Sequence, residues 1–252
     1  EHGVPFTMRE NLPNLFDTWM AKDIMCYLQL ALGNRSREKF LKIANRPVRY
    51  LSRTAFTESE VSFDKLRAYY AVKNQEWMEE RIWNFEYDLK NLASLSPYAA
   101  IHFIRKGIGY DEFLKTYADE RNVNADDWFD VLDEMQEMAR DKKSIPEFLS
   151  FVENYGDTLE EIRQEQKKQQ VKEEPGVSLM TMHASKGLEF PVVFVPTLNE
   201  DIVPYRKAVQ EGNLEEERRM LYVAMTRAKT YLHLSFVKER FHKEAEPSPF
   251  LY

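Results

Sequence analysis

Cysteine is nearly absent from this sequence, because Cys26 is the only one among its 252 residues. A single thiol can form neither an internal disulfide nor a cysteine-based zinc site, which excludes the disulfide-rich secreted scaffolds. Cys26 lies between Met25 and Tyr27 in an apolar segment. We therefore expect a buried packing thiol, no metal site in this chain, and a reducing, cytoplasmic environment.

Long hydrophobic runs are lacking too. The longest apolar run covers residues 190–198, far short of the roughly 20 residues that a membrane helix needs. The N-terminus has no basic region followed by an apolar core, so we expect no export signal and no membrane partner. The chain begins with Glu1 rather than methionine, which indicates a piece of a longer protein.

Glycine is scarce, and its placement excludes one kind of site. None of the eight glycines is followed by lysine, so the chain has no Gly-x-x-x-x-Gly-Lys-Ser/Thr loop for the phosphates of a nucleotide. If the chain takes part in nucleotide chemistry, the phosphate loop and the Mg²⁺ ligand that belongs to it lie outside this sequence.

What is present is the composition of a globular chain, with 43% hydrophobic and 31% charged residues and a net charge of −7. The charge is unevenly distributed, because residues 35–53 carry seven basic side chains against the one acid Glu38. Contact with nucleic-acid phosphates is one interpretation of this basic stretch, and a solvated face is the other. The basic residues are Arg35, Arg37, Lys39, Lys42, Arg46, Arg49 and Arg53.

The first two thirds of the chain show helical periodicity. The clearest apolar stripe lies within residues 74–95, where we expect the flanking Trp77, Trp83 and Tyr87 to pack in the core or between helices. Ser144 to Glu147 reads as a capping box, and Gly107 to Gly109 as a turn between helices. The predicted helices are 17–32, 74–95, 96–105, 111–120, 126–140 and 144–155.

The pattern changes near residue 176, where we place a domain boundary. Residues 157–174 hold ten charged side chains in eighteen and read as a solvated helix end or tether, which Pro175 and Gly176 interrupt. Two short apolar runs, a helix and a third run then predict a parallel α/β sheet. The predicted strands are 177–183, 191–196 and 231–237, and the predicted helix is 214–228.

Residues 181–190 place His183, Ser185, Lys186 and Glu189 between two of these strands. Loops at the carboxyl ends of parallel strands are common ligand sites, and Gly187 allows a tight backbone path there. Lysine suits a phosphate, and a carboxylate accepts hydrogen bonds from hydroxyl groups. Taken singly, His183 would more often be a structural histidine and Lys186 a surface charge. As a ten-residue string between strands, these residues favour a functional site.

Residues 212–229 form a second informative string. Arg227 follows the predicted helix and precedes a strand, where a guanidinium could reach the phosphate of a ligand. The alternative is a cation that neutralises the helix C-terminus.

These two strings resemble motifs V and VI of superfamily 1A DNA helicases of the UvrD/PcrA/Rep group. The family patterns are Thr-x-His-x-x-Lys-Gly-Leu-Glu-Phe and Glu-Glu-Arg-Arg-Leu-x-Tyr-Val-x-x-Thr-Arg-Ala, and both are long and specific. Weaker matches occur at residues 16–30, 200–204 and 247–251. Residues 46–49 are similar to the start of the family's inserted domain, although relatives continue with Gly-Ile-Gly where this chain has Tyr50, Leu51 and Ser52.

The resemblance implies a mostly α-helical insertion domain plus part of an α/β RecA-like (P-loop NTPase-type) parallel sheet. Residues 1–32 would supply a strand and helix of RecA-like domain 2A and the hinge. Residues 33–175 would form the helical 2B domain. Residues 176–252 would complete domain 2A with motifs V and VI.

The resemblance also implies roles for single residues. Arg227 would be an arginine finger, and Glu189 and Gly187 would lie at the nucleotide. His183, with Thr181, Ser185 and Lys186 as weaker candidates, would contact single-stranded DNA. On the separate ground of charge, because an acidic domain that approaches DNA needs a local basic face, we expect Arg46, Arg49 and Arg53 to contact duplex phosphates near the junction.

The expected function is therefore the C-terminal portion of an ATP-dependent DNA helicase that moves 3′-to-5′ and acts in DNA repair. Its cofactors would be ATP and Mg²⁺, with the Mg²⁺ site outside this chain, and its partners single-stranded DNA, DNA junctions and an N-terminal RecA-like lobe. The chain alone should not hydrolyse ATP. Two alternatives remain: a non-catalytic nucleic-acid-binding or protein-interaction module, and part of a recombination helicase-nuclease.

Overall fold

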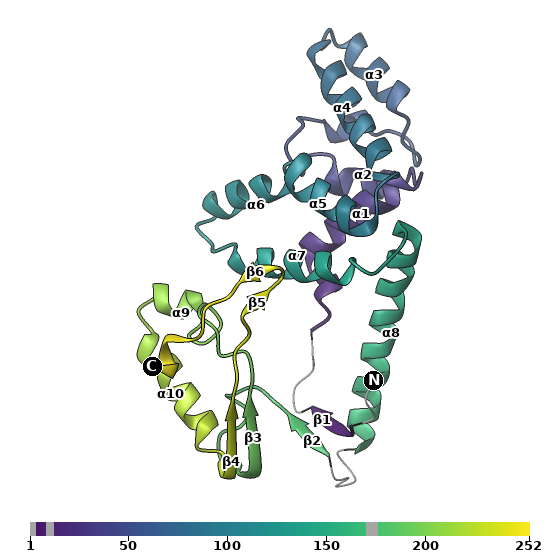
Figure 1. Ribbon diagram of the computed structural model, residues 1–252. Helices are drawn as coiled ribbons and strands as arrows, with labels where there is room; N and C mark the ends of the chain where they lie inside the picture. Colours follow the sequence, from purple (N-terminus) through teal and green to yellow (C-terminus); the bar gives the residue numbers. More distant parts are fainter. Residues whose placement is uncertain (1–3, 9–12, 170–175) are drawn as a thin grey trace. The chain divides into compact units, whose positions relative to one another are not determined.

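The computed structural model describes residues 4–8, 13–169 and 176–252 (Figure 1). The chain divides into two compact units: residues 13–158 form a helical unit, and the described residues of 1–12 and 159–252 form an α/β unit. In these described ranges, no helix combines the length and the apolarity that crossing a membrane requires.

The helical unit is built from short helices joined by tight turns. Three shorter helical turns accompany them: η1 (Leu15–Asp17), η2 (Arg53–Ala55) and η3 (Phe103–Gly107). The last helix begins in this unit and ends in the other. The helices are α1 (Trp19–Ala31), α2 (Arg37–Ile43), α3 (Phe63–Val72), α4 (Trp77–Leu92), α5 (Pro97–His102), α6 (Tyr110–Asp119), α7 (Asp126–Met138) and α8 (Ile145–Gln169).

Helix α1 is the centre of the helical unit. Ile24, Tyr27 and Leu28 are fully buried, and the helix packs against α2, α4 and α7. The predicted division placed residues 1–32 apart from the helical domain and a boundary near residue 176. By its contacts, α1 groups with the helical unit, which covers residues 13–158.

Each of the six helices predicted in this part of the chain is present, with changes at the ends. Helix α8 continues to Gln169, and residues 170–174 of the predicted charged tether lie outside the described residues, as does Pro175. Segment 96–105 divides into α5 and the π-helical η3, and Gly109 at φ +88° forms the expected turn before α6. Helices α2 and α3 were not predicted.

The prediction that Trp77, Trp83 and Tyr87 pack in the core was wrong. Their exposed fractions are 54%, 58% and 51%. The apolar stripe of α4 already fills the interface beneath the helix, and Trp83 and Tyr87 lie on the opposite side of it. Their rings stack on each other, with centroids 5.9 Å apart, as residues four apart on a helix can.

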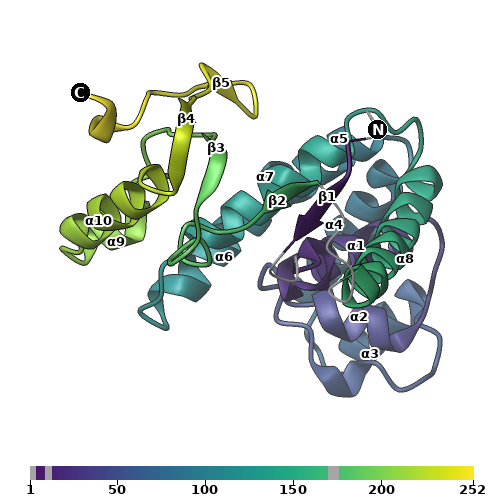
Figure 2. The same cartoon turned by 90° about the horizontal axis from the view of Figure 1, so that it is seen from below.

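The α/β unit contains small parallel sheets. Strand β1 (Phe6–Met8) pairs with β2 (Val177–Leu179), and β3 (Phe190–Val195) pairs with β4 (Ala228–Leu234), both in parallel. The antiparallel pair β5 (Glu239–Arg240) and β6 (Lys243–Glu244) forms a hairpin. Figures 1 and 2 show α10 (Leu214–Met225) beside β3 and β4, and α9 (Arg206–Gln210) and η4 (Pro249–Leu251) complete the described part of this unit.

The predicted parallel sheet is therefore only partly correct. In the described residues, the two parallel pairs do not join into one sheet. The strand predicted at 177–183 ends at Leu179, because residues 182–187 fold into turns. A small apolar core lies between the β3–β4 pair and α10, and its buried residues are Val195, Leu198, Val203, Leu221 and Ala224.

Candidate functional site

The parallel pairing of β3 with β4 brings the two informative strings together. Phe190, the first residue of β3, lies opposite Ala228, the first residue of β4. The backbone N–H of Phe190 donates to the carbonyl of Arg227 over 2.9 Å. Glu189 and Arg227, which are 38 positions apart in the sequence, therefore lie at adjacent strand ends.

The guanidinium of Arg227 is fixed at the junction between α10 and β4. Its Nε donates to the carbonyl of Val223 over 2.8 Å, its Nη1 to the carbonyl of Leu188 over 3.1 Å, and its Nη2 to Oγ1 of Thr226 over 3.0 Å. A guanidinium has five N–H donors, so these three bonds hold the group in place and leave two donors for a ligand. The side chain is half-buried.

Glu189 is held less firmly. Its carboxylate lies 3.1 Å from Nζ of Lys229, and 62% of its side chain and 56% of that of Lys229 are exposed. An exposed ion pair of this kind contributes little to stability and opens readily, which keeps the carboxylate available. Gly187 precedes it at φ +82°, a backbone conformation that a side chain would strain.

The turn at residues 181–188 uses some of its polar side chains internally. Oγ of the buried Ser185 donates to the carbonyl of Met182 over 2.6 Å, and Oγ1 of Thr181 accepts from the N–H of Ala184 over 3.2 Å. These bonds shape the turn. Of the four predicted DNA-contacting residues of this turn, Ser185 is buried, whereas Thr181, His183 and Lys186 are exposed.

The position of the site differs in part from the prediction. The turn at 181–188 follows the carboxyl end of β2, as expected, but Glu189 and Arg227 lie at the amino ends of β3 and β4. Each of these two residues directly precedes the first residue of its strand, and β2 pairs with β1 instead of β3. The turn therefore connects the two parallel pairs.

The predicted basic residues of the helical unit are largely occupied by internal contacts. Nη1 of Arg46 lies 2.8 Å and 3.1 Å from the two carboxylate oxygens of Asp23, which is fully buried. The hydroxyl of Tyr110 donates to the same carboxylate over 2.8 Å. Burial raises the pKa of Asp23, and the hydrogen bond and charge of Arg46 oppose that shift.

Arg49 is inside the helical unit, which corrects the expectation that its side chain faces a phosphate. It is 8% exposed, and its guanidinium donates to the carbonyls of Ile43, Ala44 and Pro47 and to the hydroxyl of Tyr27. A backbone that turns sharply over residues 43–47 leaves carbonyl groups that need donors, and the buried arginine provides them.

The basic stretch is therefore divided, because Arg46 and Arg49 make internal contacts whereas Arg35, Arg37 and Arg53 are exposed. Arg35 donates to the carbonyl of Leu30 over 3.0 Å, and Arg37 to the carbonyl of Phe56 over 2.6 Å. Of the three residues predicted to contact duplex phosphates, Arg53 is the exposed one. A count of basic residues in the sequence could not separate the internal arginines from the exposed ones, because an arginine can donate equally to a phosphate or to a buried carbonyl.

Two further features escaped the sequence reasoning. The β5–β6 hairpin places Phe241 and His242 at φ +51° and +58°, which is strained for residues with side chains. In the helical unit, Tyr50 at φ +60° forms a cluster with Trp77 and Arg81. One indication of this cluster was present in the sequence, the replacement of the family's Gly-Ile-Gly by a segment that begins with Tyr50.

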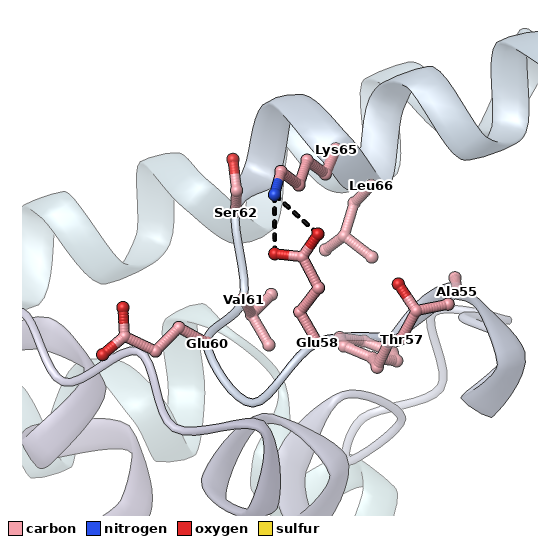
Figure 3. Close-up of a pocket in the computed structure, with 9 residues that line it drawn as sticks. Ala55, Thr57, Glu58, Glu60, Val61, Ser62, Lys65 and Leu66 are labelled. Atoms are coloured by element: carbon pink, nitrogen blue, oxygen red, sulfur yellow. Dashed lines mark hydrogen bonds and ion pairs between the residues drawn. The ribbon is translucent and has the colours of Figure 1, made fainter.

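Cavities suitable for a small molecule are not prominent in the described part of the chain. Figure 3 shows a hollow beside the Glu58–Lys65 ion pair, with a volume of about 20 Å³, room for about one water molecule. A groove of about 320 Å³ lies between α10 and the C-terminal segment, lined in part by Leu221, Tyr222 and Phe250. Within the described ranges, no three histidine, cysteine or acidic side chains gather as metal ligands would.

Comparison with known proteins shows to which family the chain is similar. Residues 1–239 match the UvrD-like helicase C-terminal domain. The chain is 29% identical over 242 residues to the ATP-dependent DNA helicase PcrA of Bacillus subtilis (strain 168), which covers 89% of this chain and 32% of that protein. It is 29% identical over 286 residues to the ATP-dependent DNA helicase Rep of Escherichia coli (strain K12), covering 98% of this chain and 40% of Rep. The chain thus spans well under half the length of these relatives.

Proposed function

We propose that this chain, which belongs to the family of UvrD-like helicase C-terminal domains, supplies the arginine finger and part of the DNA track of a longer ATP-dependent DNA helicase. ATP and Mg²⁺ would be held chiefly by an N-terminal RecA-like lobe outside this chain. Movement along single-stranded DNA in the 3′-to-5′ direction, unwinding at DNA junctions and a role in DNA repair in the cytoplasm belong to the same proposal.

The observation that carries this proposal is the junction of the two motifs at the ends of β3 and β4. Three internal hydrogen bonds orient the guanidinium of Arg227, and two of its donors stay available for an anionic ligand. A cation fixed before the ligand arrives is what stabilises the charge that develops on a transferred phosphoryl group. Thus the fixed guanidinium fits the role of an arginine finger.

The residues around Arg227 fit the remaining parts of a nucleotide site. Glu189 is exposed and can accept hydrogen bonds from the hydroxyl groups of a ribose once its ion pair with Lys229 opens. Gly187 leaves space above the turn, because no atom lies within 4 Å of where its Cβ would be. When bound, ATP would supply the phosphoryl group. The residues of this chain would help to bind and orient the nucleotide and would neutralise charge on its phosphates.

The division into domains 2A and 2B is part of the proposal. The parallel pairs and α10 would belong to the RecA-like domain 2A, and the helical unit would be domain 2B. We propose that His183 and Lys186, with Thr181 and Ser185 shaping their turn, contact single-stranded DNA. Arg53 is the remaining candidate for a duplex phosphate.

The decisive experiment uses the longer protein that contains the phosphate loop. We expect Arg227→Ala to lower DNA-stimulated ATP turnover by about 10³-fold or more, the scale known for arginine fingers. Arg218→Ala is the matched control, because Arg218 lies on α10, the helix that ends just before Arg227, is exposed and pairs with Glu215. ATP turnover by the Arg227→Ala protein at the wild-type rate, with DNA present, contradicts the assignment.

A second measurement separates this proposal from a module without motor function. The purified chain of residues 1–252 should show no ATPase activity and weak nucleotide binding, since Glu189 and Arg227 are at most half of a site. DNA-stimulated ATP hydrolysis by this chain alone contradicts that expectation. A longer protein without a phosphate loop would support the non-catalytic module, and one with a downstream nuclease domain would support the helicase-nuclease alternative.

A further inference from the structure

The loop at residues 45–52 is built rigidly from beneath. Oδ1 of Asn45 accepts hydrogen bonds from the N–H groups of Arg49 and Leu51, over 3.2 Å and 2.9 Å, and its Nδ2 donates to the carbonyl of Leu51 over 2.8 Å. The guanidinium of Arg49 lies 4.4 Å from the ring centroid of Phe85. The loop is therefore anchored by the half-buried Asn45 and the buried Arg49, which make several directed contacts.

Alternate residues of this loop point in opposite directions. Arg49 and Leu51 are buried, at 8% and 3% exposed, whereas Val48 and Tyr50 are 57% and 64% exposed. Tyr50 adopts φ +60°, which costs free energy for a residue with a side chain. A strained backbone that presents a large ring to solvent gains nothing for the core, so the strain points to a role on the surface.

Two side chains of α4 complete the surface around this ring. The guanidinium carbon of Arg81 lies 4.7 Å from the ring centroid of Tyr50 and 5.1 Å from that of Trp77. Trp77 is 54% exposed. A cation between two rings holds both of them in place and leaves ring surface open to solvent. We refer to Tyr50, Trp77 and Arg81 as the aromatic cluster.

We propose that the aromatic cluster is a stacking site for an unpaired nucleobase of DNA. This stacking site rests on the proposed function, because it gives the helical unit a contact with the DNA on which the helicase acts. Open aromatic rings beside an arginine are the surface on which bases stack, and they accept any base because each has a π-face. The exposed Arg53, three residues along from Tyr50, offers a charge for the adjoining phosphate.

The surroundings favour a base over the other classes of ligand. Glu76 and Glu80, both exposed, flank Trp77 on α4 and disfavour a phosphate backbone that runs along this helix. A docked protein needs roughly 1,200 Å² or more of total buried surface. Two rings, one arginine and Val48 provide only a small part of that area, but they match the size of one or two bases.

The site is tested with the chain of residues 1–252 and a fluorescent oligothymidylate of about 12 nucleotides, which is within the range that single-strand-binding folds cover. Tyr50→Gly removes the ring and suits the positive φ, so it separates loss of binding from loss of folding. We expect it to weaken binding about 5- to 150-fold, the range for one lost stacking contact. The slope of log K against log salt should stay unchanged, because no phosphate contact is lost.

Two control variants sharpen the result. Tyr50→Phe should bind as the wild type does, since the ring and not the hydroxyl makes the contact. Trp83→Ala should also be unchanged, because Trp83 is an equally exposed tryptophan on the same helix, 58% exposed, that lies outside the aromatic cluster. An oligonucleotide that contains 2-aminopurine should lose fluorescence on the wild-type protein and retain it on Tyr50→Gly.

The outcomes are distinguishable from those of the proposed function. If the wild type and Tyr50→Gly bind the oligonucleotide equally tightly, the stacking site is overturned and the assignment of Arg227 is untouched; a protein partner is then the remaining occupant. If the wild type does not bind the oligonucleotide even at low salt, the stacking site and the proposed DNA contacts fail together. Loss of ATP turnover in Arg227→Ala is measured separately, in the longer protein.

Discussion

Asp23 is an ionisable residue whose surroundings penalise its charge. It is fully buried, and desolvation raises its pKa above the ordinary value of 3.8 despite the contact with Arg46. The folded state therefore binds a proton at Asp23 more readily than the unfolded state does. Where the unfolded state binds fewer protons than the folded state, stability falls as the pH rises.

This gives a pH prediction for Asp23→Asn. The free energy of unfolding of the wild type minus that of the variant should fall as the pH rises from about 3.8 through the raised pKa of the folded state. The fall is about 1.4 kcal/mol for each unit of the shift. Urea unfolding between about pH 3.5 and 7 measures it.

Arg49 and Arg53 are four positions apart in the sequence and should behave oppositely when replaced. Arg49→Ala removes the guanidinium from the carbonyls of Ala44 and Pro47 and from the hydroxyl of Tyr27, so we expect it to lower the free energy of unfolding by about 3 kcal/mol or more. Arg53→Ala should change it by no more than about 0.5 kcal/mol.

Arg49 and Arg53 should also differ in DNA binding, because only Arg53 is exposed. Arg53→Ala should flatten the dependence of log K on log salt for duplex DNA by about 0.9, the value for one phosphate contact. Its effect should be the same for all sequences. An unchanged slope and affinity for Arg53→Ala would show that this residue is part of a solvated surface only.

At the scale of elements, the start of α8 depends on two reciprocal hydrogen bonds. Oγ of Ser144 accepts from the N–H of Glu147 over 3.3 Å, and the Glu147 carboxylate accepts from the N–H of Lys143 over 2.9 Å. The predicted capping box is present, shifted by one residue at its second bond. Its role is to satisfy backbone donors that the first turn of a helix leaves free.

We expect Ser144→Ala to destabilise the protein by about 1 kcal/mol, because it removes the cap. Ser150→Ala, further along the same helix and exposed, is the control. It should stabilise by a few tenths of a kcal/mol, since alanine has the higher helix propensity. Urea midpoints measured side by side check both values, and equal effects of the same sign would contradict the role of the cap.

Elements that repeat an apolar residue over several turns could be predicted from the sequence. Helices α4 and α8 have such stripes, whereas α2 spans only seven residues and gives periodicity too little length. The two- and three-residue strands carry almost no local signal. For the site, the residues of each motif were identifiable as contiguous strings, and parallel pairing then explains why Glu189 lies beside Arg227.

What the sequence could not supply was the side to which a residue points. Trp83 fits a core position by composition, yet it lies opposite the apolar stripe of α4. Arg49 belongs to the basic stretch of the sequence, yet its guanidinium is buried and binds carbonyl groups of the loop at residues 45–52 and of the preceding turn. Both outcomes depend on neighbours that are distant in sequence, and local patterns do not contain them.

At the scale of the whole molecule, the two units differ in the size of their cores. The helical unit has one buried cluster of 33 apolar residues, whereas the buried cluster in the described residues of the α/β unit has five. Because hydrophobic burial is the main stabilising contribution, we expect the α/β unit to unfold at lower denaturant concentration. The two transitions should therefore be separable.

The tryptophans make this prediction measurable. All four, Trp19, Trp77, Trp83 and Trp128, belong to the helical unit. Their fluorescence should report one late urea transition, whereas far-ultraviolet circular dichroism should show an earlier loss of signal as well. Superimposed curves from the two probes would mean that the chain unfolds as a single cooperative unit.

The β3–β4 pair has one further consequence, which concerns the behaviour of the chain in concentrated solution. Helix α10 covers one face of the pair, while Phe194 and Tyr231 are 69% and 62% exposed, and the ring of Phe194 stacks on His233 with centroids 4.6 Å apart. Among the residues that the structure describes, β3 and β4 pair only with each other. An apolar strand face with an unpaired edge is a template for association with other copies. We therefore expect the purified chain to associate at high concentration while its helices are still folded. Light scattering should record this as a mean particle size that increases with protein concentration.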